Sequence, residues 1–401
     1  FVTSVLFCGN SFMATKEHKD HKEPCLEERM LTDCSMECHV TLDPCPFFFH
    51  LFHAPEFVYV SLYVLFPEGG HMDTIRFGRT ELRVTCTGFG VLPIQRTERA
   101  EAVRILRRAY EGGITFYDTA RNYTDSEDKL GAAMAGVRER VVIATKSAAQ
   151  TRDGVLKDVE TSLRNLRTDH VDILQAHNPA PLPNPDDAQS AYAGLLQARR
   201  EGKTRFVGVT CHSIANALAA TDSGRYDTIQ SPLSCISDAR DLALVERCRE
   251  KDLGLIAMKP LCGGLLTNAR SAFAFFRQYP TVVPIWGIQR MTELEEFLEL
   301  NAHPPSMDEA VRAQIERDRK ELAGSFCRAC GYCLPCPADI AIPMAARMNL
   351  LLRRMPYQQF LTPDWKDKMG RVRDCTACGH CSQNCPYGLD AQALLRKALA
   401  D

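Results

Sequence analysis

The sequence predicts an α/β fold, a closed (β/α)8 barrel followed by a small, mostly helical domain rich in cysteine. Short β-rich runs alternate with amphipathic helical stretches from residue 72 to about residue 300. This alternation is typical of a parallel sheet covered by helices. Eight strand–helix units fit a TIM barrel in number and in length. Two runs of four cysteines then fall within the last 75 residues.

The predicted barrel begins with a hairpin formed by residues 74–78 and 82–85. The strands expected after it are residues 86–89, 115–117, 141–145, 171–175, 206–209, 228–230, 254–258 and 282–285. Apolar residues recur at helical spacing between them, most clearly at residues 98–111, 152–166, 188–201 and 242–251.

An open, doubly wound sheet is the alternative to a barrel. That fold normally carries a G-x-G-x-x-G loop after its first strand. Here Gly88 and Gly90 are followed by Val-Leu-Pro, so this fingerprint is absent from the sequence. In a barrel, the chemistry takes place at the carboxyl ends of the strands.

Composition limits the class of protein. The chain has 401 residues, enough for two or three domains, and its net charge of −2 provides no basic field for nucleic acid. Of 18 cysteines, several are dispersed without metal-ligand spacing. Such thiols are typical of a reducing compartment, so we expect a cytoplasmic protein.

Residues 1–71 differ from the rest in having irregular cysteine spacing and poor periodicity. The apolar stretch at 46–67 contains histidines, a glutamate and prolines, so membrane attachment is not expected. Met72 opens a segment with the features of an ordinary protein start. We interpret residues 1–71 as an extension outside the functional fold. The alternative is a genuine membrane-associating or metal-binding leader.

The two cysteine runs predict iron–sulfur clusters. They are Cys-x2-Cys-x2-Cys-x2-Cys-Pro at residues 327–337 and Cys-x2-Cys-x2-Cys-x3-Cys-Pro at residues 375–386. Three closely spaced thiolates and a fourth before proline are the ligand pattern of a cubane cluster. Zinc is the alternative, but zinc sites usually pair two Cys-x2-Cys motifs across a long gap. A disulfide framework does not suit a reducing compartment.

In ferredoxins with two clusters, the fourth cysteine of each run ligates the other cluster. We therefore expect two 4Fe-4S clusters in a dicluster ferredoxin-like domain at residues 327–401, after a helical linker at 306–326. Residues 343–354 are expected to be helical, with Trp365 in the loop after them. The expected ligands of one cluster are Cys327, Cys330, Cys333 and Cys385, and those of the other are Cys375, Cys378, Cys381 and Cys336.

Polar residues follow three consecutive predicted strands of the barrel. Asp118 and Tyr123 follow the second strand, Lys146 ends the third, and His177 ends the fourth. Each alone has a structural explanation, such as a helix cap or a loop aromatic. Together they point into one barrel mouth and form a catalytic set.

This set suits the reduction of a carbonyl group. A tyrosine hydroxyl can donate a proton to the carbonyl oxygen as hydride reaches the carbon. We expect Lys146 to lower the pKa of Tyr123, Asp118 to hold the lysine, and His177 to orient the carbonyl.

At residues 72–305 the chain resembles the aldo-keto reductases. The resemblance depends on the four residues above in family order, and on segments 112–120, 168–172, 202–210 and 258–264. With the cysteine runs, the whole resembles a ferredoxin-fused branch of that family. The resemblance implies that NADP(H), or alternatively NAD(H), lies across the barrel mouth. It implies contacts from Gly88, Thr210, His212, Gln230, Leu261, Gly263, Gly264, Gly287, Gln289, Arg290 and Glu296.

Within this set, Thr210, His212 and Gln230 would lie near the nicotinamide, and the loop from Leu261 would cover the pyrophosphate. Arg290 could pair with a 2′-phosphate. The predicted function is NAD(P)H-dependent reduction of a small-molecule aldehyde or ketone.

The clusters then need an explanation, because nicotinamides move two electrons as hydride and clusters move one. No flavin motif is visible. The clusters are therefore expected to be structural, to sense oxygen or iron, or to serve a redox partner protein. The alternative function is an electron-transfer or redox-sensing protein with a barrel that does not turn over.

Overall fold

The computed structural model describes most of the chain after residue 71 and only short strands before it. The chain divides into two compact units, Phe1–Phe66 and Pro67–Asp401. The described residues are four short strands near the start of the chain and residues 72–322, 326–355 and 357–401.

The first unit contains two antiparallel strand pairs. These are β1 (Val5–Cys8) with β2 (Ser11–Ala14), and β3 (Phe49–His50) with β4 (Tyr59–Val60). The interpretation of residues 1–71 as an extension otherwise falls outside the described residues.

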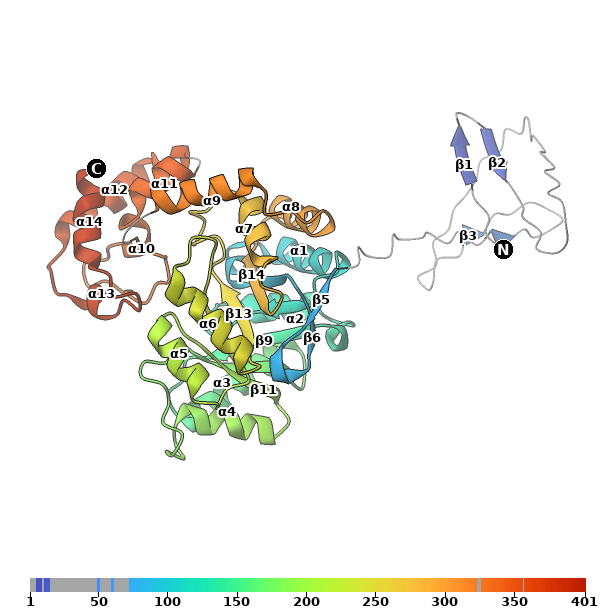
Figure 1. Ribbon diagram of the computed structural model, residues 1–401, viewed down its shortest axis with the longest axis horizontal. Helices are drawn as coiled ribbons and strands as arrows, with labels where there is room; N and C mark the ends of the chain where they lie inside the picture. The colour runs from blue at the N-terminus through green and yellow to red at the C-terminus, as the bar shows by residue number, and fades with distance from the viewer. Residues whose placement is uncertain are drawn as a thin grey trace. The chain divides into compact units, whose positions relative to one another are not determined.

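Eight parallel strands of the second unit close into a barrel, which confirms the predicted fold class (Figure 1). Each strand pairs with the next along the chain, and the last pairs with the first through Ile285 and Gly88. In chain order the strands are β7 (Gly88–Gly90), β8 (Phe116–Asp118), β9 (Val142–Ser147), β10 (Val171–His177), β11 (Thr204–Thr210), β12 (Thr228–Pro232), β13 (Gly254–Met258) and β14 (Val282–Gly287).

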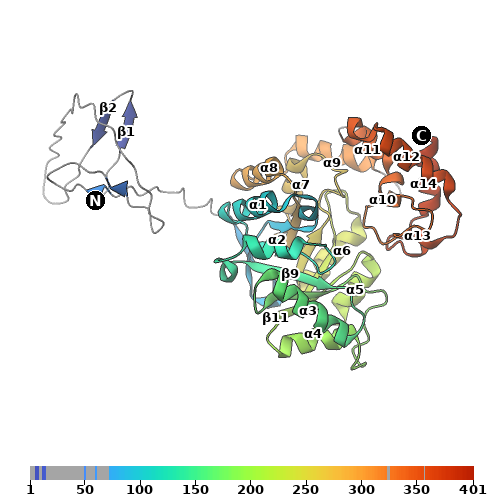
Figure 2. The same ribbon diagram turned by 180° about the vertical axis from the view of Figure 1, so that it is seen from behind.

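A helix follows each strand, and the helices surround the barrel in both ribbon views (Figure 2). Amphipathic spacing explains this arrangement, because each helix buries its apolar side against the strands. The helices are α1 (Arg99–Glu111), α2 (Ser126–Ala133), α3 (Arg152–Leu166), α4 (Ala191–Arg200), α5 (Ile214–Asp222), α6 (Ala239–Glu250), α7 (Ala269–Phe276) and α8 (Met291–Ala302).

The predicted hairpin is present and closes the amino end of the barrel. Strand β5 (Thr74–Arg76) pairs with β6 (Arg83–Thr85). Phe77 between them is fully buried, with its ring 5.6 Å from that of Phe116. Gly254 leaves room for Phe77, because a Cβ there would lie 2.6 Å from the ring. The active sites of such barrels lie at the opposite, carboxyl end of the strands.

The tail is mostly helical, as predicted. Helix α9 (Glu309–Glu321) leads from the barrel into it, and Leu351 and Phe360 of the tail belong to the same apolar core as the barrel. The tail helices are α10 (Ile342–Ala345), α11 (Met348–Arg354), α12 (Pro363–Gly370), α13 (His380–Gln383) and α14 (Ala391–Ala400).

The tail contains the helical stretch expected at 343–354, whereas the prediction of a loop at Trp365 is wrong. The helical stretch is divided into α10 and α11, because Arg347 leaves the helical conformation with a φ of −134°. Its guanidinium donates to the carbonyl oxygen of Gly263 in the barrel, at 2.9 Å. Trp365 lies in α12 and not in a loop, since the Thr362 hydroxyl accepts a hydrogen bond from its backbone N–H and caps the helix.

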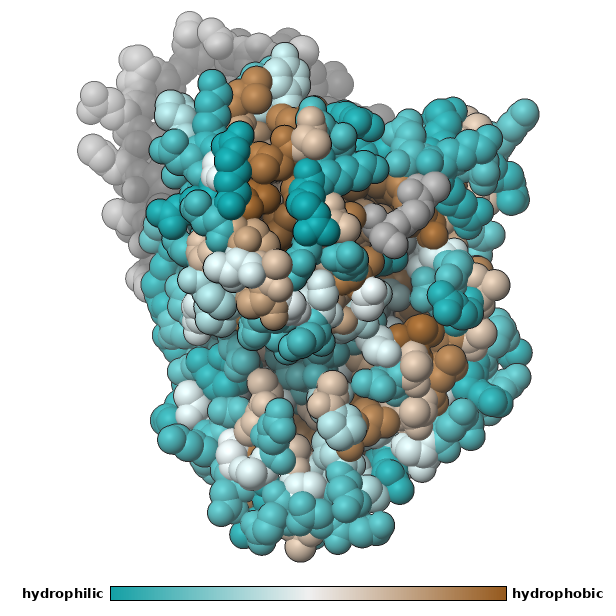
Figure 3. Space-filling model, turned by 90° about the vertical axis from the view of Figure 1, so that its left-hand side faces the viewer, coloured by the Kyte–Doolittle hydropathy of each residue, from teal (hydrophilic) through white to brown (hydrophobic). Residues whose placement is uncertain are grey.

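Large apolar side chains are exposed on the tail. Figure 3 shows apolar side chains gathered among hydrophilic ones on the side of the molecule where the tail lies. The exposed large apolar side chains among the described tail residues are Leu334, Leu352, Tyr357 and Leu361. None of the described helices has both the length and the apolar character that a membrane span requires.

Candidate active site

The four predicted catalytic residues lie together at the carboxyl end of the barrel. Asp118 ends β8, His177 ends β10, and Lys146 comes from β9 between them. The Nζ atom of Lys146 is 2.6 Å from Asp118 Oδ1 and 5.2 Å from the centre of the Tyr123 ring. The rings of Tyr123 and His177 meet edge to face, 5.7 Å apart.

The ion pair beneath Tyr123 is buried, with Asp118 and Lys146 exposed by 2% and 1%. Burial raises the pKa of Asp118 and lowers the pKa of Lys146, and the opposite charge of the partner counteracts both shifts. Lys146 also donates a hydrogen bond to the carbonyl oxygen of Thr119, at 2.6 Å. These bonds compensate for the loss of water around the two charges.

Two buried amides, those of Gln230 and Gln175, donate hydrogen bonds to the carboxylate of Asp118. Gln230 Nε2 donates to Asp118 Oδ1 at 3.3 Å, and Gln175 Nε2 donates to Gln230 Oε1 at 2.8 Å. The Thr210 hydroxyl donates to Gln175 Oε1 at 3.2 Å. Gln175 was not among the site residues predicted from the sequence. Its position two residues before His177 places both side chains on the same face of β10, which was the available signal.

The expected lowering of the Tyr123 pKa is wrong. Burial raises the pKa of Tyr123, and the charge of Asp118 adds to this shift. The ammonium of Lys146 faces the ring of Tyr123, and at this position it does not offset the rise in the Tyr123 pKa that burial causes.

His177 is held neutral. Burial, together with the smaller effect of the nearby Lys146 charge, lowers the pKa of His177 to about 3. Its Nδ1 atom is buried without a hydrogen-bond partner among the described residues. A neutral imidazole with an unpaired nitrogen can bind a polar ligand.

A cleft of about 550 Å3 opens at the carboxyl ends of β11, β12 and β13, and its lining residues do not include the four catalytic candidates. His212 and Lys259 line it from the barrel, and Arg328 and Tyr387 line it from the tail. Lys259 adopts a φ of 56°, an unusual conformation for a residue other than glycine. The barrel and the tail thus each place a cationic side chain at the cleft, which Asp238 and Asp241 also line.

The residues predicted near the nicotinamide and pyrophosphate lie around this cleft in different ways. His212 lines it, whereas Thr210 and Gln230 are buried beneath and bonded to the polar network. Gly263 is covered by the tail, since a Cβ there would lie 3.1 Å from Arg347 Nη1. Gly264 lies beside it, with its N–H donating to the carbonyl oxygen of Leu261 at 2.9 Å.

The other predicted cofactor residues lie elsewhere. Gly88 is buried in the barrel wall, where a Cβ would lie 2.9 Å from Phe116, so the structure does not bring it to the cleft. Gly287 and Gln289 are at the end of β14, with Arg290 and Glu296 exposed at helix α8. Arg290 forms an ion pair with Glu293, at 2.7 Å.

The first cysteine run lines a pocket in the tail together with part of the second run. The lining thiols are Cys327, Cys330, Cys333, Cys381 and Cys385. Apolar residues complete the wall, including Ile342 and Leu394.

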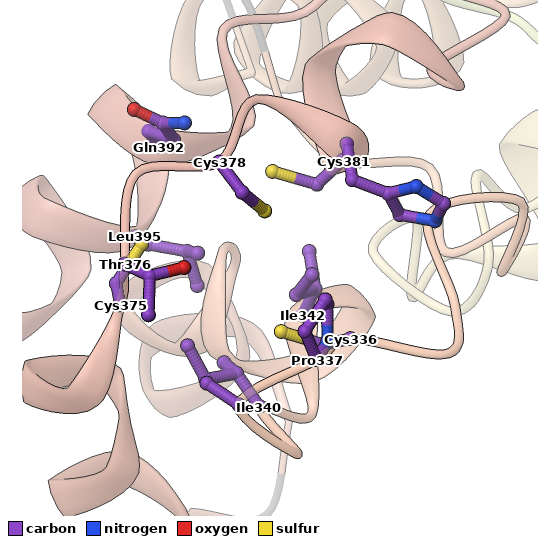
Figure 4. A pocket seen from close by; sticks show the side chains of 12 residues that line it. Cys336, Pro337, Ile340, Ile342, Cys375, Thr376, Cys378, Cys381, Gln392 and Leu395 are labelled. Atoms are coloured by element: carbon purple, nitrogen blue, oxygen red, sulfur yellow. The ribbon is translucent and has the colours of Figure 1, made fainter.

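A second pocket is lined by the remaining cysteines, namely Cys336, Cys375 and Cys378, with Cys381 again at its edge. Figure 4 shows the side chains of Cys336, Cys378 and Cys381 directed toward the space between them. Among the described residues, no three His, Cys, Asp or Glu side chains are placed to hold a metal ion. The cysteine thiols line the two pockets instead. This number of thiolates is sufficient to ligate iron–sulfur clusters.

Comparison with family models matches two segments of the chain. The model of the aldo/keto reductase family matches residues 86–278, and the model of a 4Fe-4S dicluster domain matches residues 326–390. The first segment contains all four catalytic candidates and the second contains both cysteine runs.

Individual relatives agree with the family match. L-galactose dehydrogenase of Arabidopsis thaliana is 31% identical over 48% of this chain and 66% of its own length. The uncharacterized oxidoreductase YrpG of Bacillus subtilis is 30% identical over 49% of this chain and 68% of its own length. The chain thus spans about two thirds of the length of each of these two relatives.

Among solved structures, an aldo-keto reductase from Bacillus halodurans in its holo form superposes with a TM-score of 0.55. It is 19% identical and covers 62% of this chain and 96% of its own. At this level of identity the likeness concerns the fold alone.

The buried ion pair generates a stability prediction. Replacing Lys146 by Met leaves the Asp118 carboxylate buried without its counter-charge, and we expect a loss of about 3–5 kcal/mol in the free energy of unfolding. Urea denaturation followed by circular dichroism measures this loss. Adding Asp118→Asn to Lys146→Met removes the orphaned charge and should recover part of the stability. A single variant as stable as the wild type would contradict the prediction.

Proposed function

Since the chain belongs to the aldo/keto reductase family and is an oxidoreductase of that type, we propose that it reduces a small-molecule aldehyde or ketone with NAD(P)H, with Tyr123 as proton donor. The observation that carries the proposal is the position of Tyr123 above the buried Asp118–Lys146 pair and beside neutral His177. Each of these residues has a separate task in the proposed reaction.

Tyr123 is suited to giving a proton. Because burial raises its pKa, the phenol is protonated at neutral pH and can donate to a carbonyl oxygen. The ammonium of Lys146 beneath the ring then stabilises the phenolate that remains, without any rearrangement of the site. His177 can bind the same carbonyl oxygen through an N–H group and fix its orientation.

When bound, NAD(P)H supplies the hydride for the carbonyl carbon. The cleft has room for part of a dinucleotide, since its volume of about 550 Å3 lies within the roughly 300–1,000 Å3 of small-molecule sites. Its charge fits as well, because Lys259 and Arg328 can meet phosphate oxygens. His212 would lie at the nicotinamide end. A preference for NADP(H) would require Arg290 to release Glu293 and meet the 2′-phosphate.

In the tail, we propose two 4Fe-4S clusters with crossed ligation. Cys327, Cys330 and Cys333 would share one cluster with Cys385, and the second run would take its fourth ligand from Cys336. The two pockets support this proposal, because each is lined by cysteines of both runs. The exposed apolar residues of the tail are compatible with a redox partner protein.

The proton donor is tested by Tyr123→Phe. We expect kcat for carbonyl reduction to fall by about 10²- to 10⁴-fold, because the phenol proton is lost while the ring is retained. Anaerobic oxidation of NADPH with a panel of aldehydes, ketones and quinones is the measurement. Tyr357→Phe, which changes an exposed tyrosine of the tail, should leave the rate unchanged. Full activity of Tyr123→Phe would reject the assignment. No turnover with any carbonyl would favour the electron-transfer alternative.

A pH profile tests the protonation states. His177, with a pKa of about 3, is neutral above pH 4, and the raised pKa of Tyr123 keeps the phenol protonated. We therefore expect kcat for reduction to stay level from about pH 5 to pH 8. A change in rate centred near the ordinary histidine pKa of about 6.5, absent in His177→Gln, would show that the imidazole becomes charged in the working enzyme.

Crossed ligation is tested by paired serine variants. Cys385→Ser with Cys330→Ser should remove one cluster and leave about four iron atoms per chain. Cys385→Ser with Cys378→Ser should remove both clusters. Iron and sulfide analysis after anaerobic reconstitution gives the counts, and Cys86→Ser outside the runs should retain all the iron. The reverse result for the two double variants would establish ligation within each run.

A further inference from the structure

Two tyrosines of the tail lie in the mouth of the barrel. Tyr332 is situated between Cys330 and Cys333, and Tyr387 follows Cys385 by two residues. Both are half-buried against the barrel residue His212, with ring centres 5.2 Å and 5.6 Å from the imidazole. The Tyr387 hydroxyl is 2.6 Å from His212 Nδ1. Each cysteine run thus contributes one aromatic ring to the region above the strand ends.

These rings are connected to the catalytic set through His212. Asn178 directly follows His177, and its side-chain oxygen accepts a hydrogen bond from the backbone N–H of His212, at 2.9 Å. The two rings packed on His212 are therefore one hydrogen bond away from the strand end that carries His177.

The tail is bound firmly to the barrel at this place. The guanidinium of Arg347 donates to the Gly263 carbonyl at 2.9 Å, and Arg354 donates to the Leu265 carbonyl at 2.6 Å. The guanidinium of Arg328 lies over the ring of Tyr387, 4.8 Å from its centre. Arg347 and Arg354 thus bind the tail to the barrel, and Arg328 packs one cluster-binding loop against the other.

We propose that Tyr332 and Tyr387 form an aromatic wall of the carbonyl site, and that the site therefore selects planar aromatic carbonyl compounds. The inference rests on the proposed function. The barrel already contributes the edge-to-face pair of Tyr123 and His177 and the ring of His212, which lines the cleft. Two further rings make it suited to a flat, conjugated substrate, which packs against aromatic faces and edges better than a saturated ring does.

The wall also gives the clusters a role in substrate binding. Tyr332 and Tyr387 belong to the loops that carry cluster ligands, and those loops take their shape from the bound metal. Removal of the clusters should therefore disorganise the wall and weaken substrate binding, without any transfer of electrons from the clusters to the substrate.

The first test compares benzaldehyde with cyclohexanecarbaldehyde, which has the same carbon skeleton without the planar ring. The iron-loaded full chain should show a KM about five- to tenfold lower for benzaldehyde. Tyr332→Leu keeps the residue apolar but removes the ring, and should reduce this preference to about twofold or less with a smaller effect on kcat. Tyr357→Leu, at an exposed position of the tail, should keep the full preference. Iron content verifies that each variant is loaded.

The second test does not require turnover. Calorimetry measures the binding of benzamide and of cyclohexanecarboxamide to the iron-loaded full chain in the presence of NADP+. The wild type should prefer benzamide, and the preference should disappear in Tyr332→Leu and after removal of the clusters by a chelator. Equal binding of the two amides by the wild type, or an unchanged preference in Tyr332→Leu, would overturn the inference. A benzamide preference without turnover of any carbonyl would reject the reductase and retain the wall.

Discussion

The candidate site depends on the buried ion pair between Asp118 and Lys146. Removing two charges from water costs several kcal/mol for each ion, and only close pairing with further hydrogen bonds compensates for this. The bond of Lys146 to Thr119 and the amides of Gln175 and Gln230 provide that compensation. The barrel makes the arrangement feasible, because neighbouring strands end side by side and bring residues from distant parts of the chain together.

The same pair contributes to the pKa shifts of its two neighbours. The carboxylate of Asp118 opposes ionisation of Tyr123, and the ammonium of Lys146 opposes protonation of His177. Burial is the larger cause of both shifts, so the site holds a protonated phenol and a neutral imidazole side by side. Such a site favours donating a proton over accepting one, which matches carbonyl reduction better than alcohol oxidation at neutral pH.

The sequence was sufficient to predict the barrel, the tail and the four residues at the strand ends. Alternating strand and helix periodicity determines the barrel, and its geometry brings Asp118, Lys146 and His177 to one mouth. The sequence could not show the sign of the Tyr123 pKa shift, because burial depends on packing across the barrel. Nor could it show that Arg347 breaks a tail helix to reach Gly263, since that bond joins residues 84 positions apart.

The position of the tail bears on why an oxidoreductase of this family carries iron–sulfur clusters. Hydride transfer moves two electrons at once, whereas a cluster moves one, so an electron path between them requires a converting group. A wall built from Tyr332 and Tyr387 does not need such conversion. The Tyr387 hydroxyl is hydrogen-bonded to His212, and the guanidinium of Arg328 lies over the Tyr387 ring. A change in the conformation of the cluster-binding loop would therefore move side chains at the barrel mouth. The clusters would then control the shape of the site, and carbonyl reduction would depend on iron although no electron passes through it.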